Sequence, residues 1–213
     1  MQTPTPKDTT AIAAAVGSKI KLHGDRVAVI TVNEEQADST LFLPQDRIRH
    51  WFLARVAAVG DGYVNGETRP AVVKAGDIVL MQHNQLMMQQ CATRVGDQDV
   101  FIIPQGDVLA VLDTPAVTYD TYHTAGNWVL CDVHVSNDAG GILLPSGSEA
   151  AVNPPSYTVA QLGVVALARN IASVGQTVIV NRKRATPLQF GVGKTKRVCV
   201  YVAAEDVLGT VED

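Results

Sequence analysis

Short apolar runs, separated by turn signals about every ten residues, constrain the fold of this chain most. Runs such as Val27–Ile30, Ile78–Met81 and Val100–Ile103 contain many β-branched residues, and asparagine or proline follows each within a few positions. Residues of this kind favour extended strands, and the turn formers end each strand early. Many short strands with regular turns predict an all-β barrel or sandwich.

One turn signal is specific enough to predict its conformation. Asn65-Gly66 separates two short segments, Tyr63–Val64 and Glu67–Thr68. The Asn-Gly pair adopts positive φ angles readily, which favours the two-residue turns that join antiparallel strands. The sequence therefore predicts a β-hairpin at this position.

The composition limits the classes of function. The formal net charge of −4 argues against general nucleic-acid binding, and the longest apolar runs are far too short to span a bilayer. The N-terminus shows no basic segment followed by an apolar core, as a secretory signal would. Cys91, Cys131 and Cys199 are widely spaced and imply no disulfide framework. We expect a cytoplasmic protein without nucleic-acid or membrane partners.

The N-terminal segment differs from the rest of the chain. Residues 1–19 are rich in Thr, Pro and Ala and contain only one short apolar stretch, Ala11–Val16. They predict a flexible N-terminal arm that includes one helical turn.

The strand pattern occurs twice. Asp25–Pro44 can be laid on Gly126–Pro145 without a gap, at an offset of 101 (145 − 44). The chain is therefore expected to hold two diverged copies of one β-domain, at residues 20–113 and 116–213.

The offset between the two copies changes along the chain. Val56 is matched with Val164, an offset of 108 (164 − 56), whereas Gly76 falls on Gly175 at an offset of 99 (175 − 76). This alignment implies seven extra residues in the second copy after Ile142-Leu143-Leu144, and nine missing residues where the first copy has its Asn65-Gly66 hairpin.

An apolar tripeptide stands at the same place in each copy. Ile142-Leu143-Leu144 follows Gly140-Gly141 and precedes Pro145, and Leu41-Phe42-Leu43 precedes Pro44. Three aliphatic side chains on a mobile loop are costly to leave in water, so a partner surface is one interpretation. The other is a short edge strand that folds back on its own domain.

Five segments of the first copy follow one another in an order that resembles a known family. They are the opening strand Leu22–Val27, the strand segment Val56–Gly62, the hairpin Asn65-Gly66-Glu67, the segment Val73–Val79 and the closing strand Asp107–Val111. These segments resemble the strands and the roof hairpin of the GroES family of co-chaperonins, and the second copy supplies the loop Gly140–Pro145. The resemblance covers roughly residues 20–213 and implies two tandem GroES-like β-barrels.

The resemblance also implies a function without catalysis, cofactor or metal. GroES-like proteins form rings that cap the ATP-bound chaperonin, and aliphatic tripeptides on their mobile loops dock on its apical domain. The implied partners are a chaperonin and further copies of the chain in a ring or pseudo-ring. Carried over by position, the partner-binding residues are Gly140, Gly141, Ile142, Leu143 and Leu144, and in the first copy Leu41, Phe42 and Leu43.

Some features depart from the family pattern. The first loop holds Ser39-Thr40 where the second has its glycine pair, and the second copy has no roof hairpin. The rings of the family have seven domains, which two domains per chain do not divide evenly. A GroES-fold structural protein is therefore the alternative, for example a phage capsid decoration, cement or assembly protein in the virion, bound to a capsid protein.

Other chemical signals do not reach the required pattern. Gly191–Thr195 resembles a phosphate loop, but Leu188 stands where that spacing requires glycine. None of the histidines pairs with a cysteine at metal-site spacing, and no glycine fingerprint for a dinucleotide follows a strand. A local group of basic residues is interpreted as a solvated face; its members are Arg182, Lys183, Arg184, Lys194, Lys196 and Arg197.

Overall fold

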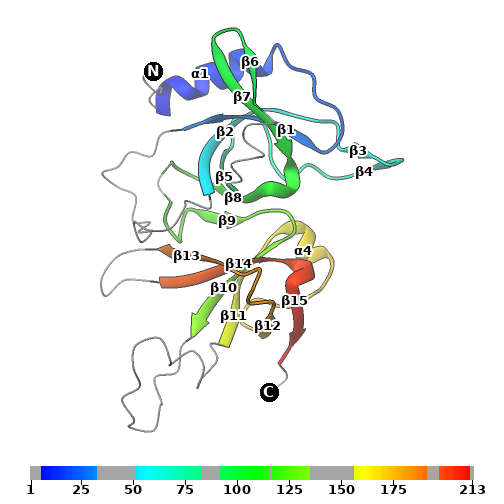
Figure 1. Cartoon of the computed structure of the whole chain (residues 1–213), viewed down its shortest axis with the longest axis vertical. Helices are drawn as coiled ribbons and strands as arrows, with labels where there is room; N and C mark the ends of the chain where they lie inside the picture. Colours follow the sequence, from blue (N-terminus) through cyan, green and yellow to red (C-terminus); the bar gives the residue numbers. More distant parts are fainter. Residues whose placement is uncertain are drawn as a thin grey trace.

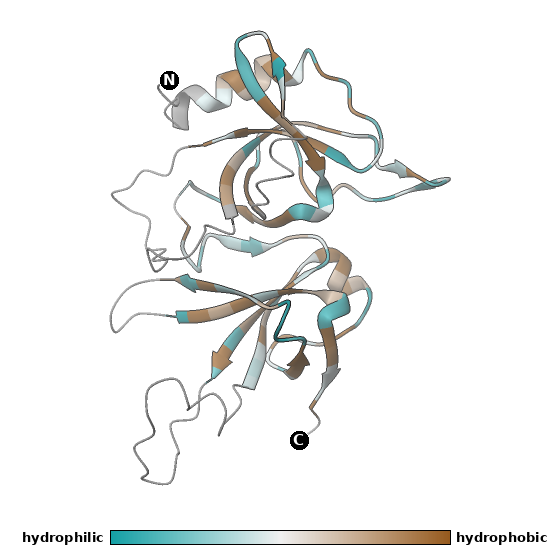
Figure 2. Ribbon diagram, in the orientation of Figure 1, coloured by the Kyte–Doolittle hydropathy of each residue, from teal (hydrophilic) through white to brown (hydrophobic). Residues whose placement is uncertain are grey.

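The computed structural model describes residues 6–32, 51–82, 92–115, 117–134, 156–190 and 197–211. Its strands form two large antiparallel sheets, one above the other in Figure 1, and one small two-stranded hairpin. Apolar residues gather on the strands of both sheets, whereas the small hairpin is largely hydrophilic (Figure 2). The prediction of an all-β fold class is confirmed.

The first sheet has the strand order β6-β7-β1-β2-β5-β8-β9. Every neighbouring pair is antiparallel. Its strands are β1 (Arg26–Thr31), β2 (Trp51–Val59), β5 (Ile78–Gln82), β6 (Ala92–Val95), β7 (Gln98–Pro104), β8 (Val108–Leu112) and β9 (Tyr122–Thr124), and a 3₁₀ turn, η1 (Gln105–Asp107), precedes β8.

The second sheet has the strand order β13-β14-β10-β11-β12-β15. Its strands are β10 (Trp128–His134), β11 (Ser156–Leu162), β12 (Thr177–Val180), β13 (Thr186–Phe190), β14 (Arg197–Ala203) and β15 (Val207–Thr210), and the 3₁₀ turn η3 (Ala204–Asp206) precedes β15. Taken strand by strand, this order repeats that of the first sheet, except that β15 has no counterpart of β9 beside it in the described residues.

Residue pairing gives the exact relation between the two sheets. A register shift lies between Ala28 and Val29 in the β1–β2 ladder, and an equivalent shift lies between Leu130 and Cys131 in the β10–β11 ladder. The first strands are therefore related by an offset of 102 (130 − 28). The predicted offset of 101 is wrong by one residue.

The second strands show a larger error in the sequence alignment. Val56 pairs with Val29, and Val159 pairs with Cys131, so β2 and β11 are related by 103 (159 − 56), not 108. Val164 instead begins the short helix α4 (Val164–Ala168). The offset of 99 is confirmed, because Gly76 and Gly175 donate to the carbonyls of Val56 and Val159 in the same way.

The predicted hairpin is present. β3 (Tyr63–Val64) and β4 (Glu67–Thr68) pair across Asn65 and Gly66, whose φ angles are 53° and 90°. Both central residues adopt the positive φ that this turn class requires. In the second sheet α4 lies at the corresponding position, and the segment is four residues shorter, since the offset falls from 103 to 99.

The N-terminal segment is not a free arm in its described part. Residues Pro6–Gly17 form helix α1, which packs on β1 and β2, beside β6 in Figure 1. Ala13 and Val16 are 2% and 4% exposed in one core with residues of the first sheet. The prediction of a flexible arm is wrong for these residues, because Ile12, Ala13 and Val16 recur at helical spacing and give the helix an apolar face to bury.

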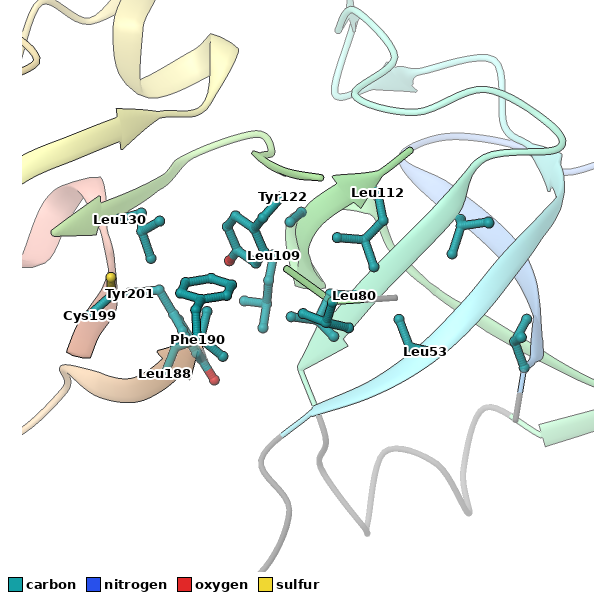
Figure 3. Packing of buried hydrophobic residues seen from close by; sticks show 14 residues of the cluster. Leu53, Leu80, Leu109, Leu112, Tyr122, Leu130, Leu188, Phe190, Cys199 and Tyr201 are labelled. Carbon is teal, nitrogen blue, oxygen red and sulfur yellow. The ribbon is translucent and has the colours of Figure 1, made fainter. Parts of the chain in front are cut away.

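The two sheets share one apolar core, seen in Figure 3. Side chains from β2, β5 and β8 meet side chains from β10, β13 and β14, and Tyr122 of β9 lies between the two groups. We call this cluster the shared core; its buried members are Val32, Leu53, Ile78, Leu80, Leu109, Ala110, Leu112, Val117, Tyr122, Leu130, Leu188, Phe190, Cys199 and Tyr201. Each sheet also has its own core on the opposite side of its central strands.

Two details of the predicted architecture differ from the structure. β9 pairs with β8 and so extends the first sheet, which places the start of the second sheet at Trp128, not near residue 116. Neither strand order closes on itself within the described residues. Both sheets are therefore open there, and closed barrels stay a prediction.

Candidate functional site

The predicted partner-binding residues lie outside the described part of the chain. Leu41, Phe42 and Leu43 fall within residues 33–50, and Gly140 to Leu144 fall within residues 135–155. What the structure does place are the four strand ends from which these two segments depart. These ends form the candidate site.

Each predicted loop connects two strands that are paired at its base. Thr31 of β1 pairs with Ala54 of β2, and the amide of Val32 donates to the carbonyl of Leu53 at 3.0 Å. In the second sheet, His134 pairs directly with Ser156. Partners in an antiparallel ladder lie only about 5 Å apart, so both ends of each loop are held together.

The two loops have nearly the same length. The offset is 102 before the loop and 103 after it, so the second loop region has one extra residue and not the predicted seven. The prediction of a much longer second loop arose from matching Val164 to Val56, and it is wrong. The loops are thus close equivalents in both position and length.

An ion pair between Arg197 and Asp132 stabilises the base of the second loop. Arg197 donates from Nε to Oδ1 of Asp132 at 2.7 Å and from Nη2 to Oδ2 at 2.6 Å. The thiol of Cys199 donates to the same Oδ1 at 3.3 Å. These donors favour the charged carboxylate and hold the pKa of Asp132 below its usual value, and the hydrogen bond from Arg197 is the largest cause.

The same arginine ties the loop base to the connector between the sheets. Its guanidinium carbon lies 3.5 Å from the ring centroid of Tyr119, and Tyr119 in turn meets Phe190 edge to face. A guanidinium this close to the face of a tyrosine ring is attracted by the ring's quadrupole, so the contact adds to the ion pair with Asp132. Sequence reasoning missed this group, because Arg197 and Asp132 are 65 residues apart and no motif links them.

Different interactions stabilise the base of the first loop. Val32 and Leu53, at its two ends, are both buried in the shared core. Arg55, further along β2, donates to the carbonyl of Gly76 at 2.9 Å and to the hydroxyl of Thr9 in α1 at 3.4 Å. Apolar packing therefore fixes the first loop base, whereas charge pairing fixes the second.

The roof hairpin is held by one carboxylate. Asp61 Oδ1 accepts from the amides of Gly24 and Tyr63 at 2.7 and 3.1 Å, and His23 lies 3.4 Å from Oδ2. The two amides are the largest causes that lower the pKa of Asp61. The hairpin follows the end of β2 opposite to the loop base, so it and the loop lie at different ends of the first sheet.

The structure separates the predicted basic cluster. Residues Arg182–Arg184 form the turn before β13. Arg197 begins β14, pairs with Phe190 at the far end of β13, and forms an ion pair with Asp132. Lys194, Lys196 and the segment Gly191–Thr195 lie outside the described residues. The group is therefore not one continuous basic face in the described part.

Metal sites and membrane-spanning helices are both absent from the described residues. Among them, no group of three or more His, Cys, Asp and Glu side chains is placed to hold a metal ion. No described helix has the length and hydropathy needed to cross a membrane.

Comparison with protein families gives one match. Residues 19–112 match the family described as the chaperonin 10 Kd subunit, and the match extends from just after α1 to the end of β8. A comparison with curated proteins gave no match. Members of this family generally oligomerise, act with a chaperonin and are not enzymes. Over these 94 of its 213 residues (112 − 19 + 1), the chain is therefore similar to the GroES-like co-chaperonin family.

Proposed function

We propose that this protein is a cytoplasmic co-chaperonin that caps an ATP-bound chaperonin through its two loops. The docking residues are Ile142, Leu143 and Leu144, and in the first loop Leu41, Phe42 and Leu43. The protein has no catalysis of its own and acts as a ring or pseudo-ring of several copies.

The family match over residues 19–112 carries this proposal. The second sheet lies outside the match, but its strand order, its register shift and its loop base repeat those of the first. These repeats support two GroES-like domains in one chain, each with one loop for the chaperonin. The predicted domain bounds, 20–113 and 116–213, would then be adjusted so that β9 belongs to the first domain.

Energetics favour several weak loops over one strong loop. Burying an aliphatic side chain contributes about 1.5–3 kcal/mol, whereas ordering a flexible loop costs about 1–2 kcal/mol for each residue. One tripeptide therefore binds weakly by itself. Loops that are carried on one assembly bind together through their high effective concentration, and fixed loop bases limit the segment that must be ordered.

A pull-down with the chaperonin of the same host, with and without ATP, tests the proposal. The full chain should bind only in the presence of ATP. Leu143→Asp should lose most of this binding, because a charge cannot enter an apolar docking groove without a partner. Val174→Asp is the matched control, since Val174 is 65% exposed in a turn away from the loops and its variant should bind as the wild type does.

Binding that ignores ATP, or that Leu143→Asp leaves unchanged, would contradict the proposed docking site. A complete lack of binding would favour the alternative of a GroES-fold structural protein in a virion. A free N-terminal arm that laces onto a neighbour would suit that alternative, and the packed helix α1 removes this argument for residues 6–17.

A further inference from the structure

Equivalent surfaces of the two sheets have opposite exposure. Leu80, Leu109 and Leu112 of the first sheet are at most 3% exposed, because they pack on the second sheet in the shared core. Their counterparts at an offset of 99 are Ile179, Leu208 and Val211, which are 53%, 66% and 44% exposed. We call these three residues the second-sheet patch. An apolar surface that is buried in one copy is thus open in the other.

The equivalence of these residues rests on pairing and not on sequence likeness. Leu80 pairs with Ala110, and the register shifts directly after it; Ile179 pairs with Gly209, and the register shifts at the same point. The second-sheet patch therefore has the backbone geometry with which the first sheet makes its contact in the shared core.

In the shared core, one surface of the second sheet packs against the first sheet, and this surface also has an equivalent in the first sheet. In the second sheet this surface includes Leu130, Cys199 and Tyr201, which are almost fully buried in the shared core. Their equivalents in the first sheet are Ala28, Val100 and Ile102, since Ala28 pairs with Ile102 as Leu130 pairs with Tyr201. We call the first-sheet residues the receiving face.

Helix α1 occupies the receiving face. Ala13 and Val16 of α1 form one buried cluster with Ala28 and Val100, and Ile102 packs against that cluster. Helix α1 thus covers the receiving face of the first sheet, whereas the first sheet covers the equivalent surface of the second sheet. In Figure 1, α1 and the edge strand β15 lie at opposite ends of the molecule, so one chain cannot join its own two surfaces.

We propose that α1 is a removable cover, and that its release lets the receiving face bind the second-sheet patch of another copy of this chain. The proposal deepens the self-association in the proposed function and rests on it: the free chain stays single while α1 covers the receiving face, and the ring or pseudo-ring forms once α1 is released. The new contact would repeat between molecules the contact that already joins the two sheets within one molecule. A head-to-tail contact of this kind builds a ring if it closes and a filament if it does not.

The contact of α1 with the sheet is small enough to be reversible. Within the described residues, its buried side chains are the small residues Thr9, Ala13 and Val16, with Ile12 partly buried, and Thr9 accepts a long hydrogen bond of 3.4 Å from Arg55. Gly17 fits directly against the sheet, because a Cβ there would lie 2.2 Å from the carbonyl oxygen of Ala57. A side chain at position 17 would therefore push the end of α1 away from β2.

The oligomeric state of the full chain tests this proposal, measured by size-exclusion chromatography with light scattering. The wild type should have the mass of one chain at micromolar concentration. Ala13→Glu, which places a charge under α1, should give a mass at least twofold higher. Ala14→Glu is the matched control, because Ala14 is exposed on the same helix and its variant should keep the mass of one chain.

A second set of variants guards against simple misfolding. Gly17→Ala should release α1 without adding charge, and hydrogen exchange of the α1 amides reports the release. Adding Leu208→Asp to either releasing variant should restore the mass of one chain, since it disrupts only the second-sheet patch. Assembly that survives Leu208→Asp, a released α1 without assembly, or a wild type that is already assembled with α1 protected would each overturn the proposal.

The two proposals can fail separately. Chaperonin binding depends on Leu143 and is measured by pull-down, whereas the effect of α1 is measured on the purified chain alone. A chain that assembles on release of α1 but never binds a chaperonin would support the cover and exclude the co-chaperonin function.

Discussion

The two sheets of this protein have the same strand order and the same register shifts, yet they bury their surfaces in different ways. The receiving face of the first sheet lies under α1, whereas the equivalent residues of the second sheet lie against the first sheet in the shared core. Leucines of β5 and β8 are buried, while the matching residues of β12 and β15 are exposed. Strand order therefore follows from the pattern within each copy, but burial depends on which neighbour each copy has.

Truncation of equivalent leucines should show the largest difference between the two sheets. Leu109→Ala removes a fully buried side chain of the shared core and should lower the free energy of unfolding by about 2–5 kcal/mol. Leu208→Ala, at the equivalent exposed position, should change it by less than about 0.5 kcal/mol. Urea denaturation measures both. Equal effects would show that the two surfaces have the same environment in solution.

A second difference concerns charge at the loop bases. The second sheet holds Asp132 and Arg197, where the equivalent positions of the first sheet hold Ile30 and Gln98. Because folding lowers the pKa of Asp132, its contribution to stability is complete above the unfolded pKa, near 4, and is lost as pH falls through the folded pKa.

Asp132→Asn should therefore lower the free energy of unfolding by about 1–2 kcal/mol at pH 7, a modest value because Arg197 is partly exposed. The difference from the wild type should shrink as the pH is lowered below about 4. Denaturation at a series of pH values measures this difference. A constant difference across the series would rule out the carboxylate as its source.

The smallest expected effect concerns the roof hairpin, which the second sheet replaces with α4. Gly66 has a φ of 90°, and a Cβ at this position would meet no other atom within 4 Å, so Gly66→Ala tests backbone strain alone. It should cost about 1 kcal/mol. Gly106→Ala is the control, because Gly106 has equal space without a positive φ, and it should be nearly neutral. Thermal unfolding measures the stability of both variants. Equal losses of stability would contradict the turn geometry.

Local signals in the sequence predicted local structure well. Asn65-Gly66 predicted its hairpin because the turn depends on the φ angles of those two residues. Gly76 and Gly175 were matched correctly, since each ends the same turn before a strand. The all-β fold followed from runs such as Val27–Ile30, whose side chains suit a sheet in any copy.

Features that depend on distant partners were not predictable from the sequence. Val164 was matched with Val56 because both begin small apolar runs, but one run is a strand and the other a helix. Leu80 and Ile179 are nearly identical in chemistry, and only the neighbouring sheet decides which is buried. For the candidate site, the eight predicted docking residues lie outside the described residues, so their role stays a prediction.

The residues of the shared core are translated at different times, because they come from both sheets. The first sheet is complete once Thr124 has been made, but Tyr201, which covers part of its leucine surface, comes 77 residues later (201 − 124). At about 5–20 residues per second, this interval is roughly 4–15 s. During translation, Leu80, Leu109 and Leu112 therefore stay solvent-exposed until the second sheet is made. The nascent chain is most prone to aggregation in this interval.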